Sequence, residues 1–179
     1  MEFASGFIGQ QADIAALFQR TFGASEGPEE GKVIGALVTE LMAAAPADAP
    51  LVFTAHEGAG VLGGIMFTRL VYDQDPRRVF LLSPVAVAPE AQQKGVGQAL
   101  IRHGLEQLRA DGADLVITYG DPNYYARVGF QQIPETVAPA PQRLSMPQGW
   151  QLCPLSGQEV EPLKGNSRCA PAFDDPALW

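Results

Sequence analysis

Apolar residues recur at helical spacing in two stretches near the start of the chain. The first stretch predicts a helix that begins at Asp13, as its N-cap, and stops near Gly23. The second follows a Gly-Pro turn and predicts an amphipathic helix that closes before Pro46. Both helices are expected to pack against a core. Their apolar positions are Ile14, Leu17 and Phe18 in the first stretch, and Val33, Ile34, Leu37, Val38, Leu41 and Met42 in the second.

Strand patterns follow the two helices. Residues 51–56 and 61–71 are apolar and rich in β-branched side chains, and a short glycine-containing loop separates them, which predicts an antiparallel hairpin. Gly63 and Gly64 inside the second run indicate a bulge or a close approach to the backbone. A weaker pattern over residues 2–7 predicts an edge strand.

The middle of the chain has a strand, a loop, a helix and a second strand in succession. Residues 78–88 form an apolar run with Pro84 in its middle, and 114–119 form a compact buried run. Because proline cannot donate a backbone hydrogen bond, the first strand must lie at an edge or carry a bulge there. Backbone groups after Pro84 are therefore expected to be open to a ligand. The helix that begins near Gly97 makes this unit a parallel crossover.

The last third of the chain changes in composition. A short helix is predicted after Gly120, with Asp121 as N-cap and Pro122 at its first position, and it is ended by Gly129. Strands follow at 130–133 and 150–153. Residues 134–179 carry eight of the fifteen prolines and both tryptophans. We expect one domain over 1–179, with a core at 1–133 and an extension at 134–179 that docks back through Phe173, Leu178 and Trp179.

Composition excludes several classes of function. A net charge of −8 disfavours nucleic acid and anionic membranes as partners, since both attract clustered Lys and Arg. Cys153 and Cys169 are far apart and lack a CxxC pattern, so reduced thiols are expected and no metal site is indicated. The N-terminus has no signal-peptide pattern and no run approaches a membrane span, which makes the cytoplasm the expected compartment.

The segment between Gln92 and Gly97 has the features of a phosphate-binding loop. It joins a strand end to a helix N-terminus, where unpaired N–H groups and the helix dipole favour a pyrophosphate, and Lys94 adds a positive charge. Glycine at 95 and 97 lets the backbone approach a ligand. The spacing does not match the GxxxxGK[ST] or GxGxxG loops, so ATP and NAD are poor ligands. A tight strand-to-helix turn without a ligand is the alternative interpretation.

A second motif narrows the ligand. Gln92-x-x-Gly95-x-Gly97 is followed by Tyr125-x-Arg127-x-Gly129-Phe130, and this pair resembles the acetyl-CoA loop and the terminal Y-x-[KR]-x-G-F segment of the GCN5-related N-acetyltransferase (GNAT) superfamily. The segments 82–87, 120–125 and 173–179 look like the YhbS-type predicted acetyltransferases of bacteria. The resemblance implies an α/β (α+β) fold with a mixed, mostly antiparallel sheet. Two splayed parallel strands would lie at its centre, with helices on both faces.

The resemblance also implies roles for individual residues. The backbone of Val85 and Val87 would hydrogen-bond the pantetheine arm, with Ala86 between them, and the amides of 93–98 would hold the pyrophosphate. Tyr125 would protonate the departing thiolate, a role that suits a phenol. The alternative is that Tyr125 is only a packed aromatic residue. Tyr124 is the expected packing residue. The cofactor-binding set is Val85, Ala86, Val87, Gln92, Gln93, Lys94, Gly95, Val96, Gly97, Gln98 and Asn123.

Two departures from the family pattern leave alternatives open. The strand 78–88 has no carboxylate to act as base, so a water chain, Glu57, Asp73 or Asp121 would have to serve. Asn123 either replaces a pantetheine-binding asparagine of relatives or is an ordinary first-turn residue. The implied function is transfer of an acetyl group from acetyl-CoA to a primary amine of a small molecule or protein, without a metal. A non-catalytic acyl-CoA-binding module and a purely structural domain are the alternatives, and a homodimer is an open alternative for the assembly.

Overall fold

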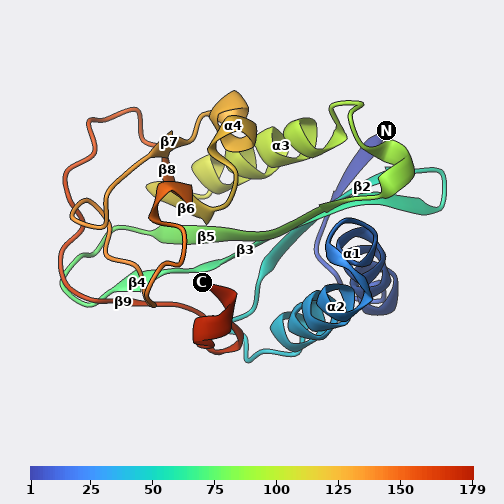
Figure 1. Cartoon of the computed structure of the whole chain (residues 1–179). Coiled ribbons are helices and arrows are strands. Elements are labelled where there is room, and N and C mark those ends of the chain that lie inside the picture. The colour runs from blue at the N-terminus through green and yellow to red at the C-terminus, as the bar shows by residue number, and fades with distance from the viewer. The chain divides into compact units, whose positions relative to one another are not determined.

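The computed structural model describes residues 1–179 (Figure 1). The helices are α1 (Gln11–Glu26), α2 (Pro28–Met42), α3 (Val96–Ala110) and α4 (Pro122–Tyr125). The strands are β1 (Glu2–Ser5), β2 (Leu51–Glu57), β3 (Gly60–Arg69), β4 (Val71–Tyr72), β5 (Val79–Val87), β6 (Leu115–Tyr119), β7 (Gln131–Gln132), β8 (Trp150–Pro154) and β9 (Ser167–Arg168). The predicted succession of helices and strands is confirmed.

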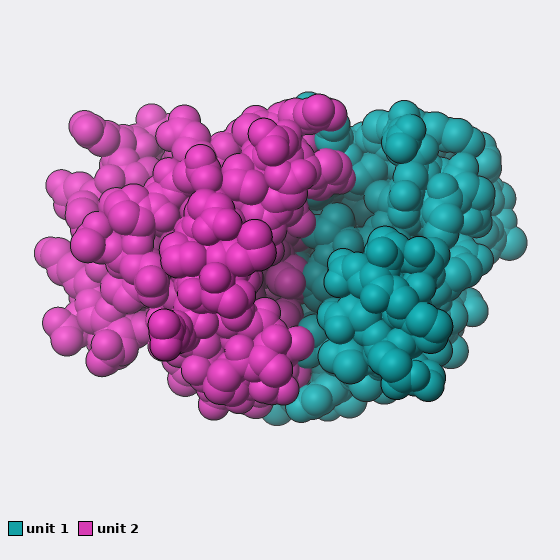
Figure 2. Space-filling model, in the orientation of Figure 1, with its two compact units in different colours: residues 1–67, 84–104 teal, residues 68–83, 105–179 magenta.

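Seven strands form one mixed sheet in the order β1-β2-β3-β5-β6-β8-β7, and β4 pairs with β9. The pairs β1–β2, β2–β3, β6–β8 and β7–β8 are antiparallel, whereas β5 and β6 are parallel. The chain divides into two compact units, residues 1–67 with 84–104 and residues 68–83 with 105–179 (Figure 2). The expected fold, mostly antiparallel with one parallel pair, is confirmed.

In the first unit, β3 carries helices on both of its faces, as expected. Side chains alternate along a strand, so Gly63 and Gly64 point to opposite faces. A Cβ on Gly63 would lie 3.3 Å from Leu100 of α3, and one on Gly64 would lie 2.9 Å from the ring of Phe18 of α1. The glycine pair therefore admits a helix on each side. The hairpin also carries a bulge, as the sequence indicated: Ala55 pairs with Gly63 and His56 with Val61, so Leu62 of β3 is the extra residue.

Helices α1 and α2 pack side by side at very short range (Figure 1). A Cβ on Gly31 of α2 would come within 2.8 Å of the Cα of Gly23 and within 2.9 Å of its nitrogen. Only glycine at position 31 therefore allows this helix crossing. Backbone contact of this kind brings the apolar faces of both helices onto the sheet, where Ile14 and Val38 are fully buried.

The predicted limits of α1 were wrong at both ends. The helix begins at Gln11 after Gln10, which makes no side-chain cap, and Asp13 lies inside the first turn. A carboxylate there still interacts favourably with the helix dipole, which explains why an acidic residue near the start looked like a cap. The helix also runs through Gly23 to Glu26 and ends before Gly27, whose φ of 105° only glycine adopts easily. Gly23 serves helix packing instead.

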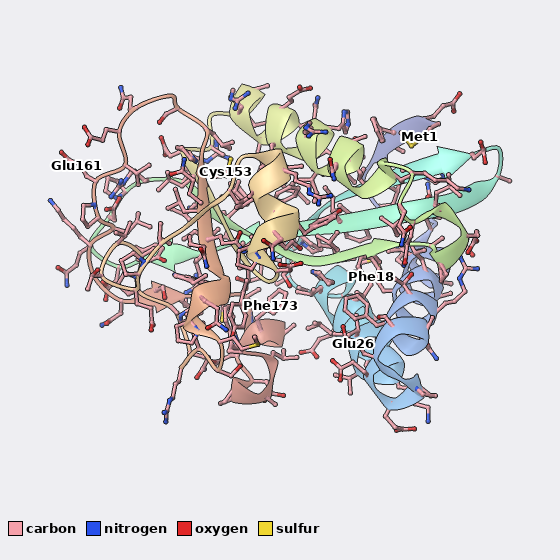
Figure 3. The ribbon with its side chains drawn as sticks, turned by 45° about the horizontal axis from the view of Figure 1, so that its top comes forward. Met1, Phe18, Glu26, Cys153, Glu161 and Phe173 are labelled. Atoms are coloured by element: carbon pink, nitrogen blue, oxygen red, sulfur yellow. The ribbon has the colours of Figure 1, made fainter.

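In the second unit, the proline-rich extension contacts β6 and β8 through its last residues. Trp179 stacks on Tyr119 of β6, with ring centroids 6.1 Å apart, and meets Trp150 of β8 edge-on at 6.0 Å. Its indole Nε1 donates to the carbonyl oxygen of Phe173 at 2.8 Å, and Phe173 is itself buried (Figure 3). Aromatic burial therefore orders a segment that has little regular structure.

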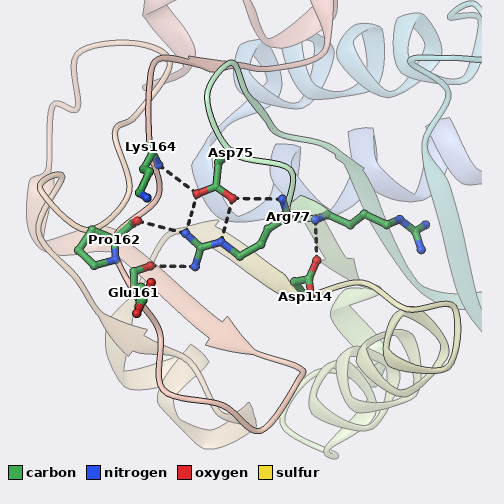
Figure 4. Close-up of polar contacts among 7 residues, drawn as sticks. Asp75, Arg77, Asp114, Glu161, Pro162 and Lys164 are labelled. Carbon is green, nitrogen blue, oxygen red and sulfur yellow. Dashed lines mark hydrogen bonds and ion pairs between the residues drawn. The ribbon is translucent and has the colours of Figure 1, made fainter.

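A buried ion pair ties the same extension to the turn before β5 (Figure 4). Arg77 donates to both carboxylate oxygens of Asp75, at 2.9 and 2.7 Å, and to the carbonyl oxygens of Glu161 and Pro162. The backbone N–H of Lys164 also donates to Asp75. The hydrogen bonds from Arg77 lower the pKa of Asp75 to about 2. This carboxylate therefore stays ionised and holds the extension in place.

Other expectations concern cysteines and metals. Cys153 and Cys169 are both free and buried, as expected for reduced thiols. The chain holds no cluster of three or more His, Cys, Asp or Glu side chains that could bind a metal ion. No helix is both long and apolar enough to cross a membrane.

Candidate functional site

The parallel pairing of β5 stops just before Pro84. It joins Val79 to Leu115 at one end and Leu82 to Thr118 at the other, so the second half of β5 lies beyond the ladder. Pro84 therefore sits inside β5 at the place where its parallel pairing ends, as the sequence indicated.

The second half of β5 directs its backbone groups to two edges. The N–H of Ala88 donates to the carbonyl oxygen of Leu62 in β3 at 2.8 Å. Because alternate residues of a strand point to the same edge, Ala86 also faces β3, while Val85 and Val87 face the opposite edge. Both valines are half-exposed. The two residues expected to bind pantetheine thus share one strand edge, and Ala86, buried at 2% exposure, belongs to the other.

The loop between β5 and α3 turns sharply at two residues. Gln93 has a φ of 60° and is the only non-glycine residue of the chain with a positive φ, and Gly95 has a φ of 79°. Left-handed residues within a loop turn successive N–H groups toward a common centre, which is the geometry of an anion-binding nest. A Cβ on Gly95 would meet no atom within 4 Å, so glycine is needed there for its conformation and not for space.

The loop leads directly into the N-terminus of α3. The first backbone bond of this helix joins the N–H of Ala99 to the carbonyl oxygen of Gly95 at 3.0 Å. The N–H groups of Val96, Gly97 and Gln98 precede that bond, so they have no partner inside the helix. The fifteen residues of α3 add the positive end of a helix dipole. Lys94 is exposed beside these groups.

Gln92 has a structural contact that its motif did not reveal. Its side-chain Nε2 donates to the carbonyl oxygen of Val87 at 3.0 Å, and the hydroxyl of Thr21 in α1 donates to the same oxygen at 3.4 Å. The carbonyl of Val87 is therefore engaged by the protein, whereas the resemblance had implied that the backbone of Val87 serves pantetheine. Gln92 fastens the start of the loop to the end of β5.

Tyr125 ends α4 in the second unit. Asp121 caps this short helix as predicted, because its carboxylate accepts from the N–H of Asn123 at 2.9 Å, and Gly129 closes the following turn with a φ of 100°. The ring of Tyr125 meets Phe130 edge-on at 5.6 Å. It also lies against Gly120, where a Cβ would come within 2.8 Å of the ring. Gly120 thus leaves room for the tyrosine.

The hydroxyl of Tyr125 belongs to a short chain of hydrogen bonds. It is hydrogen-bonded to the side chain of Thr118 in β6, which is fully buried. The interaction with Thr118 lowers the pKa of Tyr125, and the hydroxyl of Thr118 itself donates to the carbonyl oxygen of Leu82 at 2.8 Å. Burial is the main reason that the pKa of Tyr125 is raised, to about 12. The phenol is therefore protonated at neutral pH.

The remaining candidates are spread over the molecule. Asn123 is exposed in the first turn of α4. Tyr124 is half-buried, like Tyr125, and the two rings meet edge-on at 5.1 Å. Glu57 lies at the end of β2, and Asp73 accepts from the N–H of Asn166 at 2.8 Å and so orders a loop. Glu57 belongs to the first unit and Asp73 and Asp121 to the second, and the identity of a base stays a prediction.

A cavity of about 480 Å³ in the second unit was missed by sequence reasoning. Its walls come from the end of β6, the start of α4, the segment 145–149 and the C-terminal turn (red in Figure 1). The two tryptophans and the prolines signalled that residues 134–179 are ordered, but no periodic pattern showed which of them share a wall. The site residues fall in both units: the loop 92–98 in the first, and Tyr125 and Asn123 in the second.

Comparison with known proteins adds a family context to this geometry. Residues 48–132 match the acetyltransferase (GNAT) domain. The chain is 34% identical to the uncharacterized N-acetyltransferase YjhQ of Escherichia coli K12, over 93% of this chain and 91% of that protein. It is 31% identical to the uncharacterized N-acetyltransferase YhbS of the same strain over 66% of each. A GNAT family acetyltransferase from Brucella melitensis, solved in complex with acetyl-CoA, superposes with a TM-score of 0.71 at 27% identity, over 97% of both chains.

Proposed function

This chain belongs to the GNAT family of N-acetyltransferases, and we propose that it moves the acetyl group of acetyl-CoA to a primary amine by direct attack in a ternary complex. The observation that carries the proposal is the end of the β5–β6 pairing at Leu82, in the strand that leads to the glycine loop before α3. The acceptor is a primary amine of a small molecule or of a protein.

The proposed reaction needs two proton movements. The neutral amine attacks the thioester carbonyl, a C–N bond forms and the C–S bond breaks, so acetyl-CoA and the amine give an N-acetylamine and CoA. Tyr125 would give its proton to the leaving thiolate, and the amine nitrogen would lose one proton to a water chain or a carboxylate. N–H groups along β5 would meet the charge that develops on the carbonyl oxygen.

The contacts of the candidate residues support these roles. The edge of β5 that carries Val85 and Val87 offers backbone groups to the amides of a pantetheine arm. The amides of 93–98, with Lys94 beside them, suit a pyrophosphate because they combine a left-handed loop with a helix dipole. Tyr125 suits the acid because its raised pKa keeps it protonated. Asn123 is assigned to pantetheine binding by its position alone.

The test measures thiol release from acetyl-CoA over a panel of amines, for wild type and Tyr125→Phe. We expect amine-dependent release, and a fall in kcat of about 100-fold in the variant, the low end of what a general acid contributes. Tyr124→Phe is the matched control and should stay close to wild type. Unchanged turnover in Tyr125→Phe would remove its assigned role. Tight acetyl-CoA binding without turnover of any amine would favour a non-catalytic acyl-CoA-binding module.

A further inference from the structure

We propose that the 480 Å³ cavity of the second unit is the acceptor site, and that it takes a small primary amine with an apolar, aromatic-sized body. The inference rests on the proposed function and narrows it from any primary amine to this class. It depends on four observations: the size and lining of the cavity, the position of Tyr125 directly behind Gly120 in its wall, a smaller neighbouring cavity that reaches β5, and one carboxylate side chain in its wall.

The cavity has the size and character of a small-molecule site. Pockets of about 300 to 1,000 Å³ with mainly apolar walls and a few polar groups are typical of such sites. Here the apolar walls include Trp179, Met146 and Leu178. The phenol oxygen of Tyr119 accepts from the backbone N–H of Met146 at 2.7 Å and lies 3.1 Å from the hydroxyl of Ser145. These bonds hold the aromatic wall in one position, so the cavity is pre-formed.

The cavity adjoins the proposed acid through a single residue. Gly120 lines the cavity, and the ring of Tyr125 lies directly against it, since a Cβ at this position would come within 2.8 Å of the ring. An amine in the cavity would therefore be separated from Tyr125 by a residue without a side chain. A larger residue would put a wall between the acceptor and the acid.

A second, smaller cavity of about 60 Å³ lies next to the first, on the side of β5. The two share Tyr119, Leu178 and Trp179, and the smaller one reaches Ser83. Ser83 is the residue that follows the last parallel pair of β5 and precedes Pro84. The two cavities therefore lie between the C-terminal turn and the point of β5 at which its parallel pairing ends.

Asp121 supplies the charge that an amine requires. It is the one charged side chain among the cavity residues, and its side chain accepts only one bond as the cap of α4, to the N–H of Asn123. A carboxylate can accept more than one donor, so it can also receive a primary ammonium group. The net charge of −8 would draw such a cation toward the protein.

The same features disfavour other acceptors. A polyhydroxylated amine would leave its hydroxyls unpaired against the indole and aliphatic walls, which costs binding free energy. For a protein acceptor, the amine-bearing side chain would have to enter a cavity whose size suits a free small molecule. We therefore commit to the free amine and treat a peptide acceptor as an outcome of the test.

The experiment compares three acceptors, 2-phenylethylamine, ethanolamine and a short lysine-containing peptide, in the thiol-release assay with saturating acetyl-CoA. We expect kcat/KM for 2-phenylethylamine to exceed the others by at least about tenfold, the discrimination that an apolar pocket typically provides. Ala177→Trp, which fills the cavity from an exposed wall position, should lower that value by about tenfold or more. Ala110→Trp, at an exposed position outside the cavity, is the matched control and should leave it unchanged.

Asp121→Asn tests the charge separately, because asparagine also caps helices well and should preserve α4. We expect KM for 2-phenylethylamine to rise about tenfold, while KM for acetyl-CoA stays the same. Unchanged kinetic constants for 2-phenylethylamine in both Ala177→Trp and Asp121→Asn would overturn the inference. A higher kcat/KM for ethanolamine or for the peptide would also overturn it. Both results would leave the proposed function intact.

If no amine is turned over, calorimetry decides the two proposals independently. Binding of 2-phenylethylamine to the CoA-saturated protein, lost in Ala177→Trp and kept in Ala110→Trp, would support the cavity as an amine site while the proposed function fails. Absence of binding to the wild type would overturn the inference.

Discussion

Two regions of this chain are assigned to ligands, and they are built in opposite ways. The loop 92–98 is a continuous segment that would act through backbone amides, and its shape depends on left-handed residues such as Gly95. The acceptor cavity is made of side chains from segments that lie up to sixty residues apart, and the C-terminal part of its wall has almost no regular structure. A local backbone site depends on conformation, whereas a site of distant side chains depends on the contacts that order them.

The largest effect is expected from breaking the contacts that order the C-terminal extension. Asp75→Asn removes the ion pair with Arg77 and should lower the free energy of unfolding by about 2 kcal/mol at neutral pH, since each unit of pKa shift is worth about 1.4 kcal/mol. The pair is only 5% exposed on the Asp75 side, so solvent screens it little. Urea denaturation measures the loss, and Asp111→Asn, an exposed carboxylate, is the control.

The pH dependence of this loss has a defined sign. The pKa of Asp75 is lower in the folded protein, about 2, than its ordinary value of 3.8, so its contribution to stability is complete above 3.8 and is lost as the pH falls toward 2. The difference between wild type and Asp75→Asn should therefore shrink over this window. A difference that is constant from pH 7 to 2.5 would contradict the assignment to the carboxylate.

A middle-sized effect is expected from a change of backbone conformation in the loop. Gly95→Ala forces a residue with a Cβ into a left-handed conformation, which costs about 1 to 2 kcal/mol, and relaxation of that strain moves the amides. We expect the Kd for acetyl-CoA, measured by calorimetry, to rise about tenfold. Gly58→Ala is a matched control, because Gly58 also has a positive φ and open space around it but lies in the β2–β3 hairpin loop. Equal effects of both variants would exclude a specific role of the loop.

The smallest effect is expected from the hydrogen bond that positions Tyr125. Thr118→Val removes the hydroxyl between Tyr125 and Leu82, and should lower kcat about threefold to tenfold with KM for acetyl-CoA unchanged. Thr68→Val is the matched control: its buried hydroxyl has no hydrogen-bond partner, so its loss should cost little. In the Tyr125→Phe background, Thr118→Val should have no further effect on kcat. A full additional loss there would show that Thr118 acts by another route.

Local patterns in the sequence predicted most of the elements and one of the two regions. The position of the proposed phosphate loop follows from a strand pattern, two glycines and a helix pattern over one short stretch. The helix begins at Val96, one residue before the predicted start near Gly97. The cap by Asp121 and the turn at Gly129 are equally local. The limits of α1 were missed because Gly23 looks like a stop signal but is used for contact with Gly31 in another helix.

The acceptor cavity could not be predicted in the same way. Ser145, Gly149 and Ala177 belong to no periodic pattern, and their shared wall exists because Trp179 folds back onto Tyr119. The engagement of the Val87 carbonyl by Gln92 and Thr21 is likewise a tertiary contact, since Thr21 lies in a different helix.

The sequence by itself determined the order of elements, the break after Leu82 at Pro84, the position of the loop proposed to bind an anion, and the family resemblance. These features depend on backbone properties that do not require tertiary contacts: proline lacks a backbone donor, and glycine adopts a positive φ easily. Only the tertiary structure decided the chain of hydrogen bonds from Tyr125 to Leu82, the ion pair that holds the extension, and the cavity proposed for the acceptor amine. Those features are contacts between residues far apart in the chain, and side chains acquire them only when folding brings them together.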